Sequence, residues 1–191
     1  IHMLGVRFLP SGLSRFIQLP LHELTNQRIC ADEVTNFFDA SFAERLCEED
    51  NFGDRIKIIE ELFIKSLYKY DLQTDPQIAF AIEQINRHQG KLPVQSLVED
   101  ICLCQRQFER KFKMNTGYTP KIYSRIMQFK NAVDLLRSAT CDNLLSTAVH
   151  AGYYDVPHLS REIKRMSGNT PYSFLALPSP EEEVTLTYVE A

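Results

Sequence analysis

The chain has 191 residues, which is enough for one large domain or two small ones. Its hydrophobic content of 44% supplies a core, but no apolar run approaches the roughly 20 residues of a membrane-spanning helix. These values exclude a transmembrane protein, and the net charge of −4 argues weakly against a nucleic-acid partner.

The charge is unevenly distributed along the chain. Residues 1–75 carry 8 basic and 13 acidic side chains, whereas residues 76–178 carry 13 basic and 8 acidic ones. Only the middle segment has the sign that a phosphate backbone attracts, although a mixed solvated surface explains an excess of this size equally well. Residues 179–191 form an acidic tail, in which 184–189 alternate like a strand that has no evident partner.

The five cysteines are odd in number and scattered, at Cys30, Cys47, Cys102, Cys104 and Cys141. Cys102 and Cys104 have neither a second Cys pair nor a His pair at zinc-finger spacing. We expect the cysteines to be buried as small hydrophobic residues in the reducing cytoplasm. The sequence implies no metal and no cofactor.

Residues 1–72 precede a polar break, and we expect them to be the C-terminal part of a sensory or dimerisation domain, either α/β or α-helical. Residues 4–16 alternate irregularly, as in a strand pair or a loop, and helices are predicted over 31–47 and 54–70. The second helix has an apolar stripe consisting of Ile56, Ile59, Phe63, Leu67 and Tyr70. Such a stripe usually belongs to a core, and a dimer surface is the alternative.

Residues 76–178 show helical patterns alone, so the predicted fold class is mainly α. Asp75 is expected to cap the first helix, with Pro76 in its first turn. Gly117 and Gly168 are expected to end the third and sixth helices. The predicted helices cover 76–89, 94–101, 105–115, 120–137, 143–151, 156–167 and a short stretch after Pro171.

A repeat is the most informative feature of the chain. The stretch 108–113, followed by Gly-Tyr-Thr-Pro, reappears at 159–164, followed by Gly-Asn-Thr-Pro. The apolar, Arg, Lys, Gly, Thr and Pro positions match at an offset of fifty-one residues, so Arg110 corresponds to Arg161. Such a repeat indicates one supersecondary element used twice, here a helix-turn-helix.

In the first copy, the supporting helix is predicted to contribute Leu97, Val98 and Ile101. Residues 102–104 would make the turn, and Phe108 and Phe112 would face inward from the second helix. The outer face of that helix would hold Gln105, Arg106, Glu109 and Arg110. A face of this kind can enter a major groove, where Arg reads guanine and Gln reads adenine.

In the second copy, the predicted supporting residues are Leu144, Leu145 and Ala148. The turn at 152–155 is one residue longer than the first, and Asp155 is a plausible N-cap. Leu159 and Ile163 would face inward. The outer face would hold Val156, Pro157, Ser160 and Arg161.

Three lysines are expected to hold phosphates and to make affinity fall with added salt, namely Lys113, Lys121 and Lys164. The alternative for the two repeated arginines is a surface ion pair, for example with Glu109 or Glu162. Finding both arginines at one place of a repeated unit favours base reading. His158 has no partner carboxylate or Cys in motif spacing, so we expect a partly exposed helix residue.

Many of these residues form an ordered series that consists of 106–113, the following Gly-x-Thr-Pro, Arg125 with Ala132 and 135–136, Ala148, 152–155 and 158–164. The series strongly resembles the AraC/XylS family of bacterial transcription regulators over about 76–178. The resemblance implies a seven-helix module in which a long helix, 120–137, joins two helix-turn-helix units. Both recognition helices would enter the major groove on one face of the duplex, one helical turn apart.

The resemblance places the family's base-reading positions at Arg106, Glu109, Arg110, Val156, Pro157 and Arg161. Cys102 stands where the family often has Gly, and Cys104 stands at a usual Ser or Thr cap, which could cost about 1 kcal/mol. Ile163 replaces the usual Phe and keeps the site apolar. Val156 and Pro157 cannot hydrogen-bond a base, which leaves thymine methyl contacts or DNA shape to the second unit.

The sequence therefore predicts a cytoplasmic, sequence-specific transcription regulator that binds double-stranded DNA. RNA polymerase, a small-molecule effector at the N-terminal domain and a second copy of the chain are partners that the sequence leaves open. The alternative is a ligand- or partner-binding interaction protein with weakened DNA binding. No enzyme is expected, since we find no recognisable Ser/His/Asp set, Gly-rich phosphate loop, HExxH motif or helix-supported pair of carboxylates.

Overall fold

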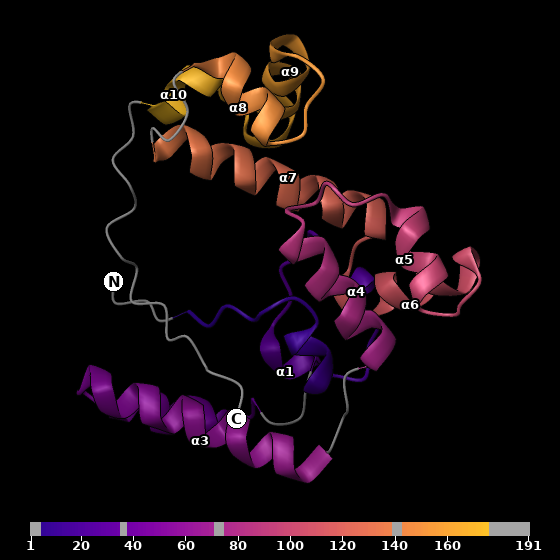
Figure 1. Ribbon diagram of the computed structural model, residues 1–191. Coiled ribbons are helices and arrows are strands. Elements are labelled where there is room, and N and C mark those ends of the chain that lie inside the picture. Colours follow the sequence, from indigo (N-terminus) through magenta and orange to yellow (C-terminus); the bar gives the residue numbers. More distant parts are fainter. Residues whose placement is uncertain (1–4, 35–37, 71–74, 139–142, 176–191) are drawn as a thin grey trace. The chain divides into compact units, whose positions relative to one another are not determined.

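A computed structural model describes residues 5–34, 38–70, 75–138 and 143–175. Every regular element within these ranges is helical (Figure 1). The chain forms two compact units, of which the first comprises Ile1–Gln84 and Pro93–Ile122 and the second Ile85–Leu92 and Tyr123–Ala191. None of the described helices is long and apolar enough to cross a bilayer.

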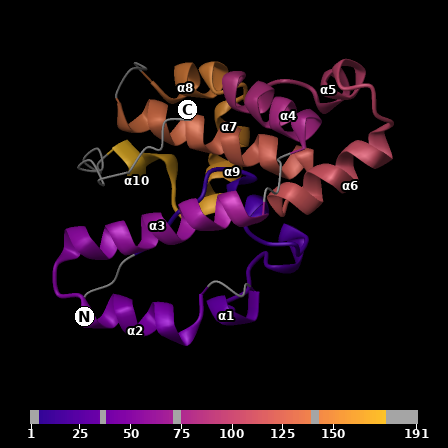
Figure 2. The ribbon, with the colours of Figure 1, turned by 90° about the horizontal axis from the view of Figure 1, so that it is seen from below.

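The N-terminal part of the first unit consists of short helices followed by a long one. The 3-10 helices are η1 (Gly12–Arg15) and η2 (Leu21–Glu23), and the α-helices are α1 (Ala31–Val34), α2 (Ala40–Glu48) and α3 (Phe52–Tyr70). The chain reverses direction between α2 and α3 (Figure 2). The described residues of the stretch 4–16 form a loop and a 3-10 helix, and they contain no strand pair.

The prediction of one helix over 31–47 is wrong, because the chain leaves the helical conformation before Ala40. Asp39 has extended backbone angles (φ −88°, ψ 174°), and its Oδ1 accepts a hydrogen bond from Phe42 N at 2.8 Å. A side chain in this position satisfies an N–H group that a new helix leaves free. The segment therefore starts a second helix at Ala40.

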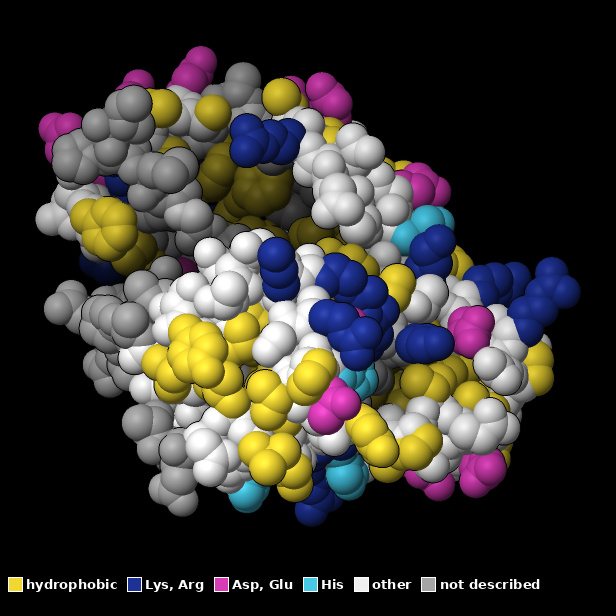
Figure 3. Space-filling model, turned by 90° about the horizontal axis from the view of Figure 1, so that it is seen from above, with side chains coloured by type: hydrophobic (Ala, Val, Ile, Leu, Met, Phe, Trp, Pro, Cys, Tyr) yellow, Lys and Arg dark blue, Asp and Glu magenta, His cyan; other side chains and the backbone are white. Residues whose placement is uncertain are grey.

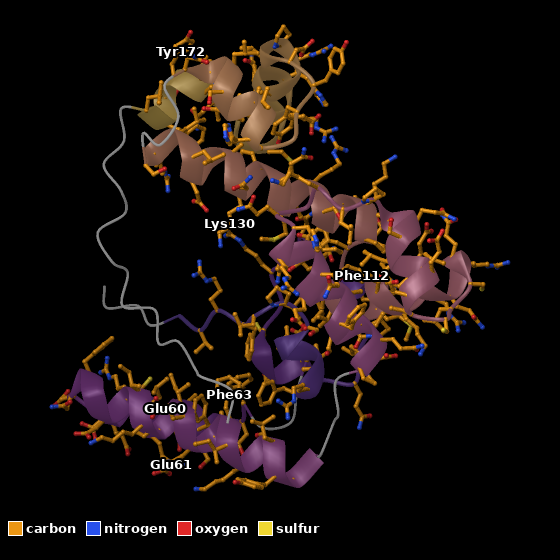
Figure 4. The ribbon with its side chains drawn as sticks, viewed as in Figure 1. Glu60, Glu61, Phe63, Phe112, Lys130 and Tyr172 are labelled. Carbon is orange, nitrogen blue, oxygen red and sulfur yellow. The ribbon has the colours of Figure 1, made fainter. Side chains whose placement is uncertain are left out.

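The predicted helix over 54–70 is confirmed as α3, and Phe63 of its apolar stripe packs against aromatic residues of the N-terminal segment. The ring of Phe63 lies 5.3 Å from that of Phe8, 4.9 Å from Phe16 and 5.9 Å from Phe38. Phe63 and Glu61 lie on opposite sides of the helix (Figure 4). Phe63 therefore contributes to a small aromatic cluster, and a core role for the rest of the stripe stays a prediction beside the dimer surface.

The seven helices predicted after residue 75 are all present, with ends within two residues of those expected. They are α4 (Pro76–Arg87), α5 (Val94–Asp100), α6 (Gln105–Thr116), α7 (Pro120–Arg137), α8 (Leu144–His150), α9 (Val156–Ser167) and α10 (Pro171–Leu175). Asp75 Oδ1 accepts a hydrogen bond from Gln77 N at 3.0 Å, which confirms the predicted cap of α4. The tail and its strand-like stretch, 184–189, lie outside the described residues.

Two glycines end the helices that follow the turns, as predicted. Gly117 and Gly168 have φ angles of 84° and 75°, and their N–H groups donate to Lys113 O and Lys164 O. This left-handed ending satisfies carbonyls at the helix end and turns the chain away. It therefore sets the length of both α6 and α9.

The buried residues reveal a longer repeat than the sequence motifs did. In α4 the buried positions are Ile78, Ala81, Ile82 and Ile85. In α7 the corresponding positions, fifty-one residues later, are the partly buried Phe129 and the buried Ala132, Val133 and Leu136. The repeated element is therefore a set of three helices, in which α4 corresponds to the later part of α7.

Candidate nucleic-acid interface

The first helix-turn-helix comprises α5, a short turn and α6. Leu97 and Ile101 are buried on the supporting side, whereas Val98, predicted together with them, is half-buried. Phe108 and Phe112 are fully buried, and their rings meet edge to face at 5.6 Å. Because Phe112 lies among the helices (Figure 4), the predicted inward face of α6 is confirmed.

The opposite face of α6 holds the residues predicted to read bases. Gln105, Arg106 and Arg110 are exposed, and Glu109 is half-buried. Gln105 Nε2 donates a hydrogen bond to Glu109 Oε1 at 3.0 Å. Among the described residues, no ion pair engages Arg106 or Arg110. Both guanidinium groups are therefore presented at the surface rather than to Glu109.

The first turn lacks two features that would stabilise it. Cys102 adopts a left-handed conformation with φ 53°, where the second turn has Gly152 with φ 80°. Cys104 is the N-cap residue of α6, and its side chain accepts no capping hydrogen bond. The predicted weak cap is confirmed, and we attribute a further cost to the side chain at Cys102.

The second helix-turn-helix comprises α8, its turn and α9, and both of its helices are capped. Asn143 Oδ1 accepts from Ser146 N at 2.8 Å at the start of α8. Asp155 Oδ1 accepts from His158 N at 2.6 Å at the start of α9, where it was predicted to cap. Since α9 also has a Pro in its first turn, its beginning is defined by backbone geometry as well as by a side chain.

The inward face of α9 is confirmed, but one predicted supporting residue is not. Leu159 and Ile163 are fully buried in the core of the second unit. Leu145 is 59% exposed, so its predicted supporting role is wrong. Thr147 and Ala151 are buried in α8 and directly after it, at the positions equivalent to the buried residues Leu97 and Ile101.

At the positions predicted to read bases, the outward face of α9 presents one guanidinium group, that of Arg161. Pro157 and Arg161 are exposed, and Ser160 is half-buried. Arg161 Nε donates to the Pro157 carbonyl at 3.3 Å. Val156, expected on the same face, packs against the hydrophobic core and keeps part of its surface exposed. The second helix therefore offers fewer polar groups than α6.

The carboxylate of Glu162 turns away from the adjacent Arg161. Arg125 Nη2, from α7, lies 2.7 Å from Glu162 Oε2 and 3.0 Å from Oε1. Arg165 Nη2 donates to Glu162 Oε2 at 3.0 Å. The ion pair that was the alternative for Arg161 is therefore formed by two other arginines among the described residues.

Next to the second turn, Tyr153 is buried, and His158 is half-buried, in agreement with its predicted partial exposure. Their rings meet edge to face at 5.2 Å. Burial, and secondarily the negative charge of Glu162, raises the pKa of Tyr153 to about 12. The phenol therefore stays neutral at all physiological pH values.

The three lysines expected at phosphates are all exposed: Lys113 in α6, Lys121 in α7 and Lys164 in α9. Lys and Arg side chains stand out at the surface in the space-filling view (Figure 3). Exposed ammonium groups on flexible stems can reach the phosphate oxygens of a duplex and bind them as point charges.

Sequence reasoning missed the glutamines that bind the two turns. Gln77 Nε2 donates to Ile101 O at 2.7 Å in the first unit. Gln128 Nε2 donates to Ala151 O at 3.0 Å and to Gly152 O at 2.9 Å in the second. The offset of fifty-one residues also relates Gln77 to Gln128, and this was the signal that could have identified them.

The predicted burial of the cysteines is wrong for the four that the structure describes. Cys30, Cys47, Cys102 and Cys104 are exposed free thiols, and Cys141 lies outside the described residues. Cys102 and Cys104 are exposed because a turn between two helices holds them at the surface. No group of His, Cys, Asp or Glu suited to a metal ion occurs among the described residues.

Comparisons with known proteins agree with this geometry. Residues 97–176 match the family model described as a helix-turn-helix domain. The xylose-binding transcription activator xylR shares the fold, with a TM-score of 0.51 and 22% identity over 58% of this chain and 29% of that one. The chain thus spans less than a third of the length of xylR. No curated protein matched in a sequence comparison.

Two further solved structures are similar over about half of the chain. A probable AraC family transcriptional regulator from Rhodopseudomonas palustris CGA009 has 18% identity and a TM-score of 0.47, over 53% of this chain and 95% of that one. The DNA-binding domain of AdpA, in complex with a target DNA, has 22% identity and a TM-score of 0.49, over 54% and 92%. The matched model and the repeated helix-turn-helix geometry together identify residues 97–176 as a helix-turn-helix domain.

Proposed function

We propose that this chain is a transcription regulator that binds double-stranded DNA, with α6 and α9 reading two successive major grooves. One observation carries the proposal: two equivalent helices each bury an apolar pair and expose an arginine at the same position, Arg110 and Arg161. A recognition helix needs this division into a packed face and a polar face.

The two helices are proposed to read different kinds of sequence. Arg106 and Arg110 donate to guanines in the first groove, and Glu109 accepts from cytosine N4. Gln105 orients that carboxylate through its 3.0 Å hydrogen bond. Arg161 is the guanidinium group of the second groove, where Pro157 and the exposed part of Val156 contact thymine methyl groups and the hydroxyl of Ser160 donates to or accepts from a base edge.

The remaining roles follow from charge and from position in the chain. Lys113, Lys121 and Lys164 hold phosphates and set the salt dependence of binding. Residues 1–72 are proposed to be the end of a sensory or dimerisation domain, residues 76–178 the DNA-binding module and 179–191 an acidic tail. A small-molecule effector, a second copy of the chain and RNA polymerase are the partners that such an arrangement serves.

Selection of bound DNA from a random-sequence pool tests the proposal. We expect enrichment of one asymmetric motif that spans about two helical turns, or roughly 20 base pairs. Enrichment of no motif would instead favour an interaction protein with weakened DNA binding. The observation that supports this second function is the missing N-cap hydrogen bond of α6, where the side chain of Cys104 is exposed and caps no N–H group.

A further inference from the structure

We propose that Lys111 and Arg125 are positioning residues of the DNA-binding module rather than phosphate contacts. Each belongs to a clamp that joins a recognition helix to the first helix of its own three-helix unit. Each clamp combines an ion pair with a glutamine that binds the turn, and the two ion pairs have opposite charge polarity. This inference rests on the proposed function, since its consequence is the orientation of α6 and α9 toward DNA.

The first clamp holds α6 to the beginning of α4 at two points. Lys111 Nζ lies 2.9 Å from Asp75 Oδ2 and 3.2 Å from Gln77 Oε1. The amide nitrogen of the same Gln77 donates to the Ile101 carbonyl, just before the left-handed residue of the turn. One glutamine therefore contacts both the turn and the cation on the recognition helix.

The second clamp holds α9 to α7 in the same manner. Arg125 donates to both carboxylate oxygens of Glu162, and 18% of the Glu162 side chain is exposed. Gln128, one helical turn later in α7, donates to the carbonyls of Ala151 and Gly152, again at the left-handed residue of the turn. The recognition helix and the preceding turn are thus held by one helix.

The two clamps occupy equivalent positions in the repeat. Gln77 and Gln128 are fifty-one residues apart, and so are Lys111 and Glu162. The cation lies on α6 in the first clamp and on α7 in the second, so the polarity of the ion pair is reversed. The remaining partners, Asp75 and Arg125, are fifty residues apart, so they are displaced by one position in the repeat. A comparison of residue types shows Lys111 and Glu162 only as a mismatch.

The clamp residue directly follows the proposed base reader in both helices. Lys111 follows Arg110, and Glu162 follows Arg161. Consecutive residues of a helix are about 100° apart around its axis, so fixing one side chain fixes the direction of the next. A helix released from its clamp can rotate, and bidentate reading of a base edge tolerates little rotation.

The clamp and simple electrostatics predict opposite changes in DNA affinity when the charge of Glu162 is removed. Removing the negative charge of Glu162 from a DNA-binding surface should strengthen binding if charge alone matters. If Glu162 positions α9, the same change should weaken binding. The test compares full-length wild type with Glu162→Gln, Arg125→Gln and the swap Arg125→Glu/Glu162→Arg, on DNA selected with the wild type and over a range of salt concentrations.

We expect Glu162→Gln and Arg125→Gln to bind about tenfold more weakly, the effect of losing roughly one contact to a base. The swap variant should bind more tightly than either single variant, but less tightly than the wild type because Arg165 loses its carboxylate partner. Arg125→Gln should keep the wild-type salt slope, whereas the control Lys164→Gln should lower that slope by about one released ion. This difference separates a positioning cation from a phosphate contact.

The opposite results are equally clear. Binding by Glu162→Gln at or above the wild-type affinity, or a reduced salt slope for Arg125→Gln, overturns the clamp. If Glu162→Gln fails to fold, Arg125→Gln decides, because weaker binding at an unchanged salt slope supports the clamp and unaltered binding overturns it. A wild-type protein that selects no DNA overturns the proposed function, whereas unaltered binding by Glu162→Gln overturns the clamp alone.

Discussion

Cys102 and Gly152 occupy the left-handed region at equivalent points of the two turns, with φ angles of 53° and 80°. A side chain in this region destabilises the folded state by about 1–2 kcal/mol. Glycine avoids this cost, but it loses more backbone entropy on folding, which offsets about 0.5–1 kcal/mol of the gain. Cys102→Gly should therefore raise the free energy of unfolding by about 0.5–1 kcal/mol in urea denaturation. Cys102→Ser keeps the Cβ atom and should give no gain; equal stability of the two variants would refute the strain argument.

Tyr153 makes stability depend on pH in the alkaline range. Burial raises its pKa from 10.0 to about 12 in the folded state, so the folded protein holds the proton more tightly than the unfolded chain. The stabilisation is complete below pH 10 and is lost as the pH rises toward 12, by about 2 kcal/mol. Tyr153→Phe should show a flatter decline of unfolding free energy over this interval, and an identical decline would argue against the assignment.

The sequence correctly predicted which residues are buried where apolar residues recur at helical spacing and polar residues occupy the opposite face. The apolar pairs Phe108–Phe112 and Leu159–Ile163 are buried because they lie four residues apart on amphipathic helices. Leu145 was misplaced because its helix has several apolar residues, and Thr147 and Ala148 are the residues turned inward. Hydrophobicity alone does not choose among neighbours on a helix as short as α8, since rotation is set by the helices packed against it.

At the scale of single elements, α6 should separate base reading from phosphate binding. Arg110→Ala should cost about 1–3 kcal/mol on the selected sequence and relax preference at one base pair. Lys113→Ala should weaken all sequences alike and lower the salt slope by about one. Titration of matched and scrambled DNA with each variant measures both effects; equal losses on both DNAs for the two variants would contradict these roles.

Helix boundaries were predictable wherever Gly, Pro or a capping side chain marked them. The helix ends at Gly117 and Gly168 and the start at Asp155 were predicted correctly. Each of these residues acts locally, either by ending a helix in the left-handed conformation or by accepting a hydrogen bond from a free N–H group. The break at Asp39 was missed, since apolar residues continue on both sides of it and the cap itself depends on one side-chain hydrogen bond. The Gln128 contacts were also missed, because they join residues more than twenty positions apart.

At the scale of the whole molecule, the proposal requires that two three-helix units act on one duplex. α7 is a continuous helix from Pro120 to Arg137, and the boundary between the two compact units of the chain falls within it. The repeat of buried positions in α4 and α7 explains how one sequence pattern could give both units. The distance between the two reading helices is set by tertiary packing. The sequence motifs therefore predicted that there are two such helices but not how far apart they lie.

The length of DNA between the two half-sites tests this claim most directly. B-form DNA turns once in about 10.5 base pairs, so inserting about five base pairs places the second half-site on the opposite face. Binding of the full chain to selected and expanded operators can be compared by titration at one salt concentration. The account predicts that the insertion lowers affinity to that of a single half-site. Equal affinity for both operators would contradict the coupled reading of two grooves.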